Sequence, residues 1–217
     1  MRKAIAAAMT RSNREIPHYY VSSEIDVSPF MAWLAERNAT CEVEHRVLYA
    51  APLLRAIALT LRKSPSLNGT YENGTYIPAQ RINIGMAIAT RKGGLITPAL
   101  LDADTFDVDA LMTRLNDLVG RTRKGGLRSS ELSLGTITLT NLGEGTADTM
   151  MPIIYPPQVA IIGCGQIRMR PWVHEGAIMP RHLLNVTLAG DHRVSDGRQG
   201  ARFLSQLASL LSQPEAL

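Results

Sequence analysis

The stretch LLNVTLAGDHRVSDGRQGARFLSQL (residues 183–207) predicts a strand, a turn and a helix in immediate succession. Residues 183–189 alternate like a strand that has one apolar face. The residues expected on that face are Leu184, Val186 and Leu188, with Asn185, Thr187 and Ala189 on the other. Gly190 lets the chain turn. His192 is therefore expected at the end of a strand and Asp196 at the start of a helix.

This placement suits two different uses of the histidine and the aspartate. A histidine held at a junction between a strand and a helix can act as a general base. The carboxylate of Asp196 can cap the free amides of the helix. A lone HxxxD pattern is more often structural than catalytic, so the pattern of His192 and Asp196 does not decide between these uses without further blocks of sequence.

The remaining elements follow from hydrophobic periodicity and turn residues. Helices are expected over residues 2–14, from Asp26 or Ser28 to Leu34, over 47–61, over 105–119 and over 196–211; strands are expected over residues 19–25, 82–90, 95–100, 136–140, 158–163 and 183–189. Two Asn-Gly pairs within residues 64–80 indicate hairpin turns. Helices and strands mix without strict alternation, which predicts one α+β or α/β sandwich domain over residues 1–217.

The composition narrows the class of protein. Hydrophobic residues make up 45% of the 217 residues and charged residues 19%, so the chain can bury a core and is not disordered. Aromatic residues reach only 5%, which argues against a stacking platform for nucleic acid. The formal charge of +4 fits an anionic small ligand, since the basic residues are spread along the chain.

The sequence predicts neither a membrane-spanning segment nor a metal site. No apolar run approaches the ~20 residues that span a bilayer, and the N-terminus lacks the apolar core of a secretory signal. Cys41 and Cys164 form neither a CxxC pair nor a metal-ligand cluster, so they are expected to be reduced thiols. We expect a cytoplasmic protein, or one of an organelle matrix if the source is eukaryotic.

A family resemblance rests on the DHRVSDG segment and on four further blocks that come before it in the chain. DHRVSDG (191–197) resembles the HxxxDG signature of dihydrolipoamide acyltransferases and chloramphenicol acetyltransferases. The blocks that resemble the dihydrolipoamide acyltransferase catalytic domain are MRKAIAAAMTRSNREIPHYY (1–20), GGLITPALLDAD (93–104), GTITLTNLG (135–143) and PIIYPPQVAIIGCGQI (152–167). The resemblance implies a two-layer sandwich of a mixed β-sheet and helices, like chloramphenicol acetyltransferase, that assembles as a homotrimer.

The same resemblance implies the activity and the roles of particular residues. His192 would take the proton from the thiol of coenzyme A, whose sulfur then attacks the thioester of acyl-dihydrolipoamide. Thr140, at the end of a strand, would donate a hydrogen bond to the resulting oxyanion; from the residues alone, it is simply part of a threonine face. The resemblance places His192 of one subunit opposite Thr140 of its neighbour.

Further site residues follow from the family with less detail. Asn141 and Gly143 complete the block that holds the oxyanion donor, and Pro98 is expected near the substrate channel, so all three are candidates for contact with coenzyme A. Asp196 would orient the site rather than abstract protons. A buried carboxylate needs a charged partner, for which the candidates are Arg2, Arg11 and Arg193. The basic loop 121–128 is usually solvated but could meet phosphates.

The partners implied are coenzyme A and a lipoyl group carried on another domain or chain, because residues 1–217 contain neither a lipoyl nor a peripheral-subunit-binding domain. Other components of a 2-oxoacid dehydrogenase complex, pyruvate dehydrogenase first, would bind the core. The loop GEGTADTMM (143–151) departs from the family, so the acyl group stays open, with acetyl first and branched-chain acyl next. The ending QPEAL lacks the family's several leucines, which leaves a cubic or icosahedral assembly open.

Two other functions compete with this one. A free-standing acetyltransferase of the chloramphenicol type shares the histidine, but its block normally has a second histidine and a cysteine before Asp-Gly, which DHRVSDG lacks. An inactive scaffold would build the core of a complex without catalysis. Such a scaffold needs neither His192 nor Thr140, and the chain has both.

Overall fold

A mixed β-sheet forms the centre of the chain in the computed structural model, which describes residues 2–89, 94–141 and 147–217. The strands, in the order in which they lie side by side, are β1 (His18–Asp26), β11 (Ala177–Asp191), β9 (Ala160–Cys164), β8 (Ile137–Asn141), β4 (Ile84–Met86) and β7 (Ala99–Leu100), with β10 (Arg168–His174) paired to β11. Strands β9, β8 and β4 run parallel, and the other pairs are antiparallel. The predicted mixed sheet is confirmed.

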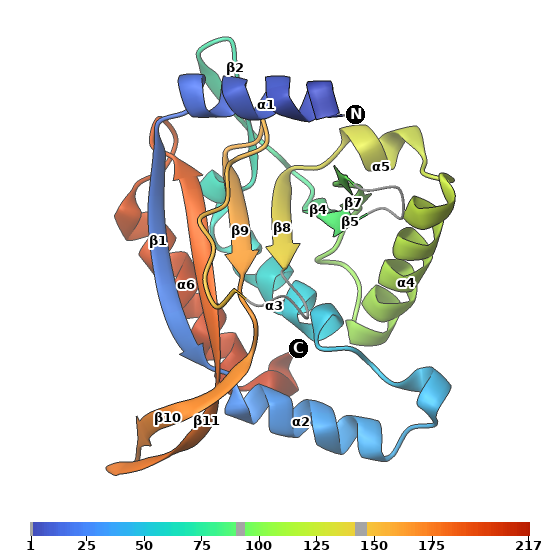
Figure 1. Cartoon of the computed structure of the whole chain (residues 1–217), viewed down its shortest axis with the longest axis vertical. Coiled ribbons are helices and arrows are strands. Elements are labelled where there is room, and N and C mark those ends of the chain that lie inside the picture. Colours follow the sequence, from blue (N-terminus) through green and yellow to red (C-terminus); the bar gives the residue numbers. More distant parts are fainter. Residues whose placement is uncertain (1, 90–93, 142–146) are drawn as a thin grey trace.

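Helices and the sheet bury one large apolar core between them. The helices that contribute to it are α2 (Ser28–Ala39), α3 (Ala50–Arg62), α4 (Val108–Lys124) and α6 (Gly197–Ser212). Alternate residues of β11 point into this core, as the sequence predicted: Leu184, Val186 and Leu188 are buried there. In Figure 1, α3 and α6 lie behind the sheet, α4 lies to its right and α2 lies below it, whereas α1 (Arg2–Glu15) crosses one end of it. The helical layer on one face is thus as expected.

The other face of the sheet is covered by a short segment rather than by a helical layer. Ile16, Ile154, Ile161 and Ala189 form a second, small apolar cluster there. Residues 147–157, which we call the strap, lead into β9 and contribute Ile154 to this cluster. The hydroxyl of Ser12 donates to the carbonyl of Ile154 at 2.6 Å, so the strap is tied to α1.

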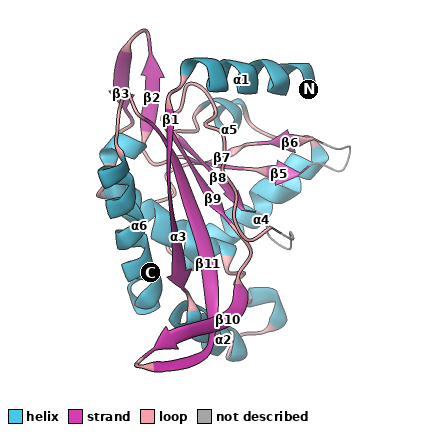
Figure 2. Cartoon of the chain, turned by 60° about the vertical axis from the view of Figure 1, so that its left-hand side comes forward, coloured by secondary structure: helices cyan, strands magenta, loops and turns pink. Residues whose placement is uncertain are grey.

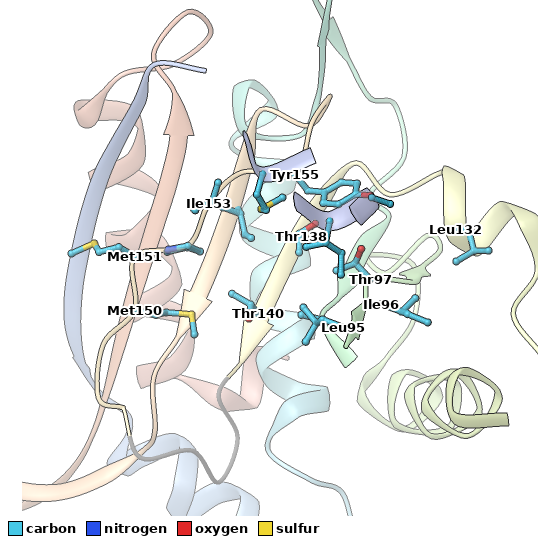
Figure 3. Close-up of a pocket in the computed structure, with 16 residues that line it drawn as sticks. Leu95, Ile96, Thr97, Leu132, Thr138, Thr140, Met150, Met151, Ile153 and Tyr155 are labelled. Carbon is cyan, nitrogen blue, oxygen red and sulfur yellow. The ribbon is translucent and has the colours of Figure 1, made fainter. Parts of the chain in front are cut away.

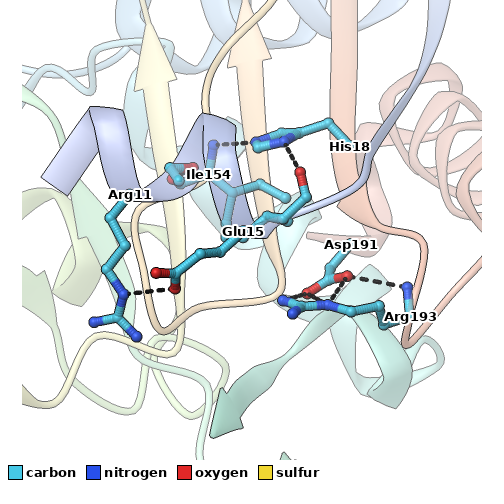
Figure 4. Close-up of polar contacts among 8 residues, drawn as sticks. Arg11, Glu15, His18, Ile154, Asp191 and Arg193 are labelled. Carbon is cyan, nitrogen blue, oxygen red and sulfur yellow. Dashed lines mark hydrogen bonds and ion pairs between the residues drawn. The ribbon is translucent and has the colours of Figure 1, made fainter. Parts of the chain in front are cut away.

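His18 ties the strap to β1 (Figure 4). The backbone N–H of Ile154 donates to Nε2 of His18 at 3.1 Å, and Nδ1 of His18 lies 2.8 Å from the carbonyl oxygen of Ile16. Nε2 can accept only if it is unprotonated, so Nδ1 carries the proton and donates to Ile16. The histidine of the IPH turn is therefore structural.

Strands β10 and β11 form an arm that projects from the sheet (Figures 1 and 2). The turn at its tip is Glu175-Gly176, with φ of 52° and 82°, the left-handed pair that a two-residue hairpin requires. Met169, Val173 and Ile178 on the arm are 62%, 67% and 77% exposed. The sequence prediction missed β10 and began its last strand at residue 183, because an arm with no buried face has no apolar alternation to detect.

Smaller differences concern the middle of the chain. The strands expected over residues 82–90 and 95–100 are each divided, into β4 and β5 (Ile88–Ala89) and into β6 (Leu95–Ile96) and β7. Only the second Asn-Gly pair, Asn73-Gly74, turns a hairpin. The remaining elements are β2 (Gly69–Glu72), β3 (Thr75–Pro78), α5 (Ser129–Ser133) and the 3-10 turns Val43–His45, Pro65–Leu67 and Pro214–Ala216. Within the described ranges, no helix is both long and apolar enough to cross a membrane.

Candidate active site

His192 lies in a turn directly after β11 and is exposed in the isolated chain. Its backbone N–H donates to the carbonyl of Pro17 at 2.9 Å, and the N–H of Asp191 donates to the carbonyl of Val159 at 2.8 Å. The amides of Val194 and Ser195 both donate to the carbonyl of Asp191. Backbone bonds on either side therefore fix the position from which the imidazole projects.

Tyr19 packs against the histidine. The two rings meet edge to face, with centroids 5.4 Å apart and an angle of 74° between their planes. The Tyr19 hydroxyl shares a hydrogen bond of 2.8 Å with the buried hydroxyl of Ser195, and burial raises the pKa of Tyr19. A Cβ at position 190 would lie 2.5 Å from the Tyr19 ring, so only Gly190 permits this approach. Because Ser195 is bonded to Tyr19, it is not presented as the nucleophile of a hydrolase.

Asp196 caps helix α6 and is exposed in the chain. Its carboxylate accepts from the N–H of Gln199 at 2.9 Å, and the Gln199 side chain accepts from the N–H of Asp196 at 3.0 Å. The expectation that this carboxylate is buried and paired with arginine is wrong. Asp196 is exposed, Arg11 pairs with Glu15, and Arg193 pairs with Asp191. The orienting role of Asp196 stays a prediction.

The buried carboxylate of the turn is Asp191, which is 0% exposed. Arg193 donates to it at 2.6 Å through Nη2 (Figure 4). This hydrogen bond with Asp191 raises the pKa of the Arg193 guanidinium. The guanidinium carbon also lies 4.0 Å from the centre of the Tyr71 ring, within cation–π distance. Sequence reasoning missed Asp191, Tyr71 and Tyr19; the charged pair flanking the histidine in DHR was the one available signal.

Thr140 lies at the end of β8 and lines an apolar cavity of about 560 Å³ (Figure 3). Most of its walls come from three places: helix α1, the segment 95–97 and the strap. The lining residues include Ile5, Met9, Leu95, Ile96, Thr97, Met150, Met151, Ile153 and Tyr155. Among the described residues, the Thr140 hydroxyl has no hydrogen-bond partner. Thr138 lines the same cavity, but its hydroxyl donates to Oε1 of Gln158 at 2.7 Å.

The structure describes only part of the three residues predicted to contact coenzyme A, which are Asn141, Gly143 and Pro98. The backbone of Asn141 ends β8, opposite Cys164; its side chain and the whole of Gly143 lie outside the described residues. Pro98 is buried, and its carbonyl accepts from the N–H of Met86 at 2.8 Å. It is not among the residues that line the cavity, although the three residues before it are.

Within one chain, Thr140 and His192 cannot act on the same atom. Strand pairing places Thr140 level with Gly163, and Gly163 level with Thr187. His192 follows Thr187 by five positions. Strand geometry therefore separates the two residues by about 15 Å along the sheet and about 10 Å across it. A general base must come within hydrogen-bond reach of its proton, so each residue can form only part of a site.

The first arginine of the predicted basic loop 121–128 lies in an ion pair. In the predicted basic loop, Arg121 binds both oxygens of Glu131 at 2.6 Å, which lowers the pKa of Glu131. Arg121 is thus not free for phosphates. Across the described ranges, no group of three or more histidine, cysteine or acidic side chains is placed to hold a metal ion.

The arrangement of the sheet and its helices is that of chloramphenicol acetyltransferase, with a TM-score of 0.58 over 94% of both chains at 12% identity, a likeness of fold alone. The fold thus places the chain in this fold class. The model of the family "2-oxoacid dehydrogenases acyltransferase (catalytic domain)" matches residues 1–217. The chain belongs to this family.

Individual relatives agree. The acetyltransferase component of the Zymomonas mobilis pyruvate dehydrogenase complex is 32% identical over 99% of this chain and 49% of its own length. Azotobacter vinelandii dihydrolipoamide acetyltransferase, studied for the role of a serine, a histidine and an asparagine in catalysis, has a TM-score of 0.92 at 27% identity, over 99% of this chain and 89% of its own. The cubic core of a pyruvate dehydrogenase complex gives the same values. The chain spans about half the length of the curated relatives it matches.

Proposed function

We propose that the chain transfers an acyl group between dihydrolipoamide and coenzyme A, at a site made by two copies of the chain. The observation that carries this proposal is a spacing. Thr140 precedes His192 by 52 positions and Asp196 follows it by four. The serine, histidine and asparagine studied in the Azotobacter enzyme have the same two spacings, on a fold with a TM-score of 0.92.

The chemistry follows from the groups present. His192 accepts the proton of the coenzyme A thiol, and the thiolate attacks the carbonyl carbon of the acyl-dihydrolipoamide thioester. Thr140 donates a hydrogen bond from its hydroxyl to the oxygen that becomes negative. When the intermediate collapses, the lipoyl sulfur leaves and takes the proton back from the imidazolium of His192. No nucleophile from the protein is needed, because both thiols belong to the substrates.

The separation of Thr140 and His192 within one chain supports a shared site. His192 is exposed on its turn, and Thr140 opens into an apolar cavity. A neighbouring copy in a homotrimer would bring its histidine to this cavity, and the two substrates could then enter from opposite sides. The apolar walls suit the hydrocarbon chain of a lipoyl arm, which another domain or another chain would carry.

Subunit complementation tests the shared site. His192→Ala and Thr140→Ala chains, each inactive alone, are unfolded, mixed and refolded together. Mixed trimers regain a measurable part of the activity, because some interfaces then pair an intact His192 with an intact Thr140. Well-formed mixed trimers without activity would place the site within one chain and refute the proposal.

Acetyl is the proposed acyl group, since the relatives are named acetyltransferase components of pyruvate dehydrogenase complexes. Release of thiol from acetyl-, succinyl- and isobutyryl-CoA in the presence of dihydrolipoamide would rank the acyl groups. Assembly into a cubic core, as in the related complex, the binding of other complex components, the cytoplasmic location and the single-domain boundary 1–217 remain proposals of the same kind.

A further inference from the structure

The turn that carries His192 is closed by its two neighbours. Asp191 and Arg193 flank the histidine, and the carboxylate of Asp191 accepts four hydrogen bonds from Arg193. One comes from the backbone N–H of Arg193 at 3.0 Å, two from Nε at 2.9 and 3.1 Å and one from Nη2 at 2.6 Å (Figure 4). The backbone of His192 lies inside this ring of bonds.

The ring of bonds is anchored on three elements. Asp191 is fully buried at the end of β11, and its backbone lies opposite that of His18 in the neighbouring strand β1. The guanidinium of Arg193 lies 4.0 Å from the ring centre of Tyr71 in β2. The N–H of Tyr71 in turn donates to the carbonyl of Pro157 at 2.8 Å. The side chain of Arg193 keeps only 31% of its exposure, so the ion pair is partly removed from water and is held in one geometry.

We propose that Asp191, Arg193 and Tyr71, together the clamp, are positioning residues that hold the His192 imidazole in its reactive orientation. This rests on the proposed function of His192. A buried carboxylate without its partner is strongly unfavourable, so loss of Arg193 forces the turn to rearrange. A catalytic group displaced by about 1 Å can cost about 10²-fold in rate. The clamp thus acts on catalysis through His192 and does not touch the substrates.

The first test is Arg193→Ala in the assembled protein. We expect kcat to fall about 10²-fold, with the KM for coenzyme A within about twofold of wild type. Added guanidinium ion, well below denaturing concentrations, restores part of the lost kcat by filling the vacated place beside Asp191, and an alkylammonium ion restores less because it is not planar. His192→Ala gains nothing from either ion. Tyr71→Leu, which leaves the ion pair intact, should lower kcat less than Arg193→Ala does.

A matched control separates positioning from general stability. Arg37 also pairs with an aspartate, Asp109, and lies 5.7 Å from the ring centre of Trp33, but in the helical layer. Arg37→Ala should leave kcat unchanged. The clamp is refuted if Arg193→Ala raises only KM, which would make Arg193 a substrate contact, or if folded Arg193→Ala keeps wild-type kcat. If His192→Ala itself remains active, the proposed function fails instead.

Discussion

Replacing Thr140 by valine separates catalysis from strand stability. Valine has nearly the shape of threonine and favours strands, and the Thr140 hydroxyl has no partner among the described residues. We therefore expect the free energy of unfolding to change by less than about 0.5 kcal/mol. If the hydroxyl stabilises the oxyanion, kcat should fall about 10²- to 10³-fold, which is about 3–4 kcal/mol, with KM for coenzyme A unchanged.

Thr138→Val is the matched substitution, two residues earlier on the same face of β8. Its hydroxyl is bonded to Gln158 at 2.7 Å, and Thr138 is 2% exposed. The Gln158 amide is held in place by its own donation to the carbonyl of Gly135 at 3.1 Å. Valine leaves Oε1 of Gln158 buried without a donor, which should destabilise the fold by about 1–3 kcal/mol. The effect on kcat should be less than about threefold, because the hydroxyl already has a partner.

Two measurements on each variant decide between these readings. Urea unfolding followed by circular dichroism gives the free energy, and transfer of acetyl from acetyl-CoA to dihydrolipoamide gives kcat and KM. The expected result is a crossed pattern, in which Thr140→Val is stable but slow and Thr138→Val is active but unstable. If kcat falls in parallel in both variants, the rate reports the integrity of β8, and Thr140 has no special role.

Three further substitutions test a close contact, a buried thiol and an ion pair of the fold. Gly190→Ala should displace the Tyr19 ring, destabilise the protein by about 1–3 kcal/mol and lower kcat; wild-type values for both would contradict the contact of 2.5 Å. Burial raises the pKa of the Cys164 thiol from 9.0 to about 12. Between these pH values the thiol therefore loses its proton only in the unfolded chain. The free energy of unfolding of wild type should therefore fall relative to Cys164→Ala above pH 9, and parallel pH curves would count against it. Hydrogen bonds from Arg121 lower the pKa of Glu131, so the stability it contributes is present above the unfolded pKa of about 4.5 and is lost as pH falls. The difference in unfolding free energy between wild type and Glu131→Gln should shrink on acidification, and a constant difference would argue against this pair.

The sequence predicted the elements whose faces differ in polarity. Residues 183–189 alternate and the residues after Asp196 repeat with helical period, so β11 and α6 were expected. The expected turn at Gly190 was wrong, because β11 continues through Gly190 to Asp191 and the turn begins at His192. The arm was missed because β10 buries neither face. Each of the two strands expected between residues 82 and 100 is two shorter strands, and a period-2 pattern says nothing about where a short strand breaks.

Candidate site residues could be named from the sequence, but their positions relative to one another could not. Asp191 and Asp196 both lie near His192 in sequence, and only the fold determines that the first is buried with Arg193 and the second is an exposed cap. The distance between Thr140 and His192 depends on the register of three strands, which no local pattern encodes. Tyr19 and Tyr71 come from distant segments, so their contacts with the turn required the structure.

The β10–β11 arm has a consequence for measuring how copies of the chain associate. From Arg168 to His174 and from Ala177 to Leu183, the strands of the arm are paired with each other, and a two-stranded ribbon is only marginally stable in water. In an isolated chain its backbone amides should exchange with deuterated solvent much faster than those of the central part of β11, which has strands on both sides. Protection of the arm against exchange, followed as protein concentration rises, would thus report any contact between the arm and another chain without a label or a mutation.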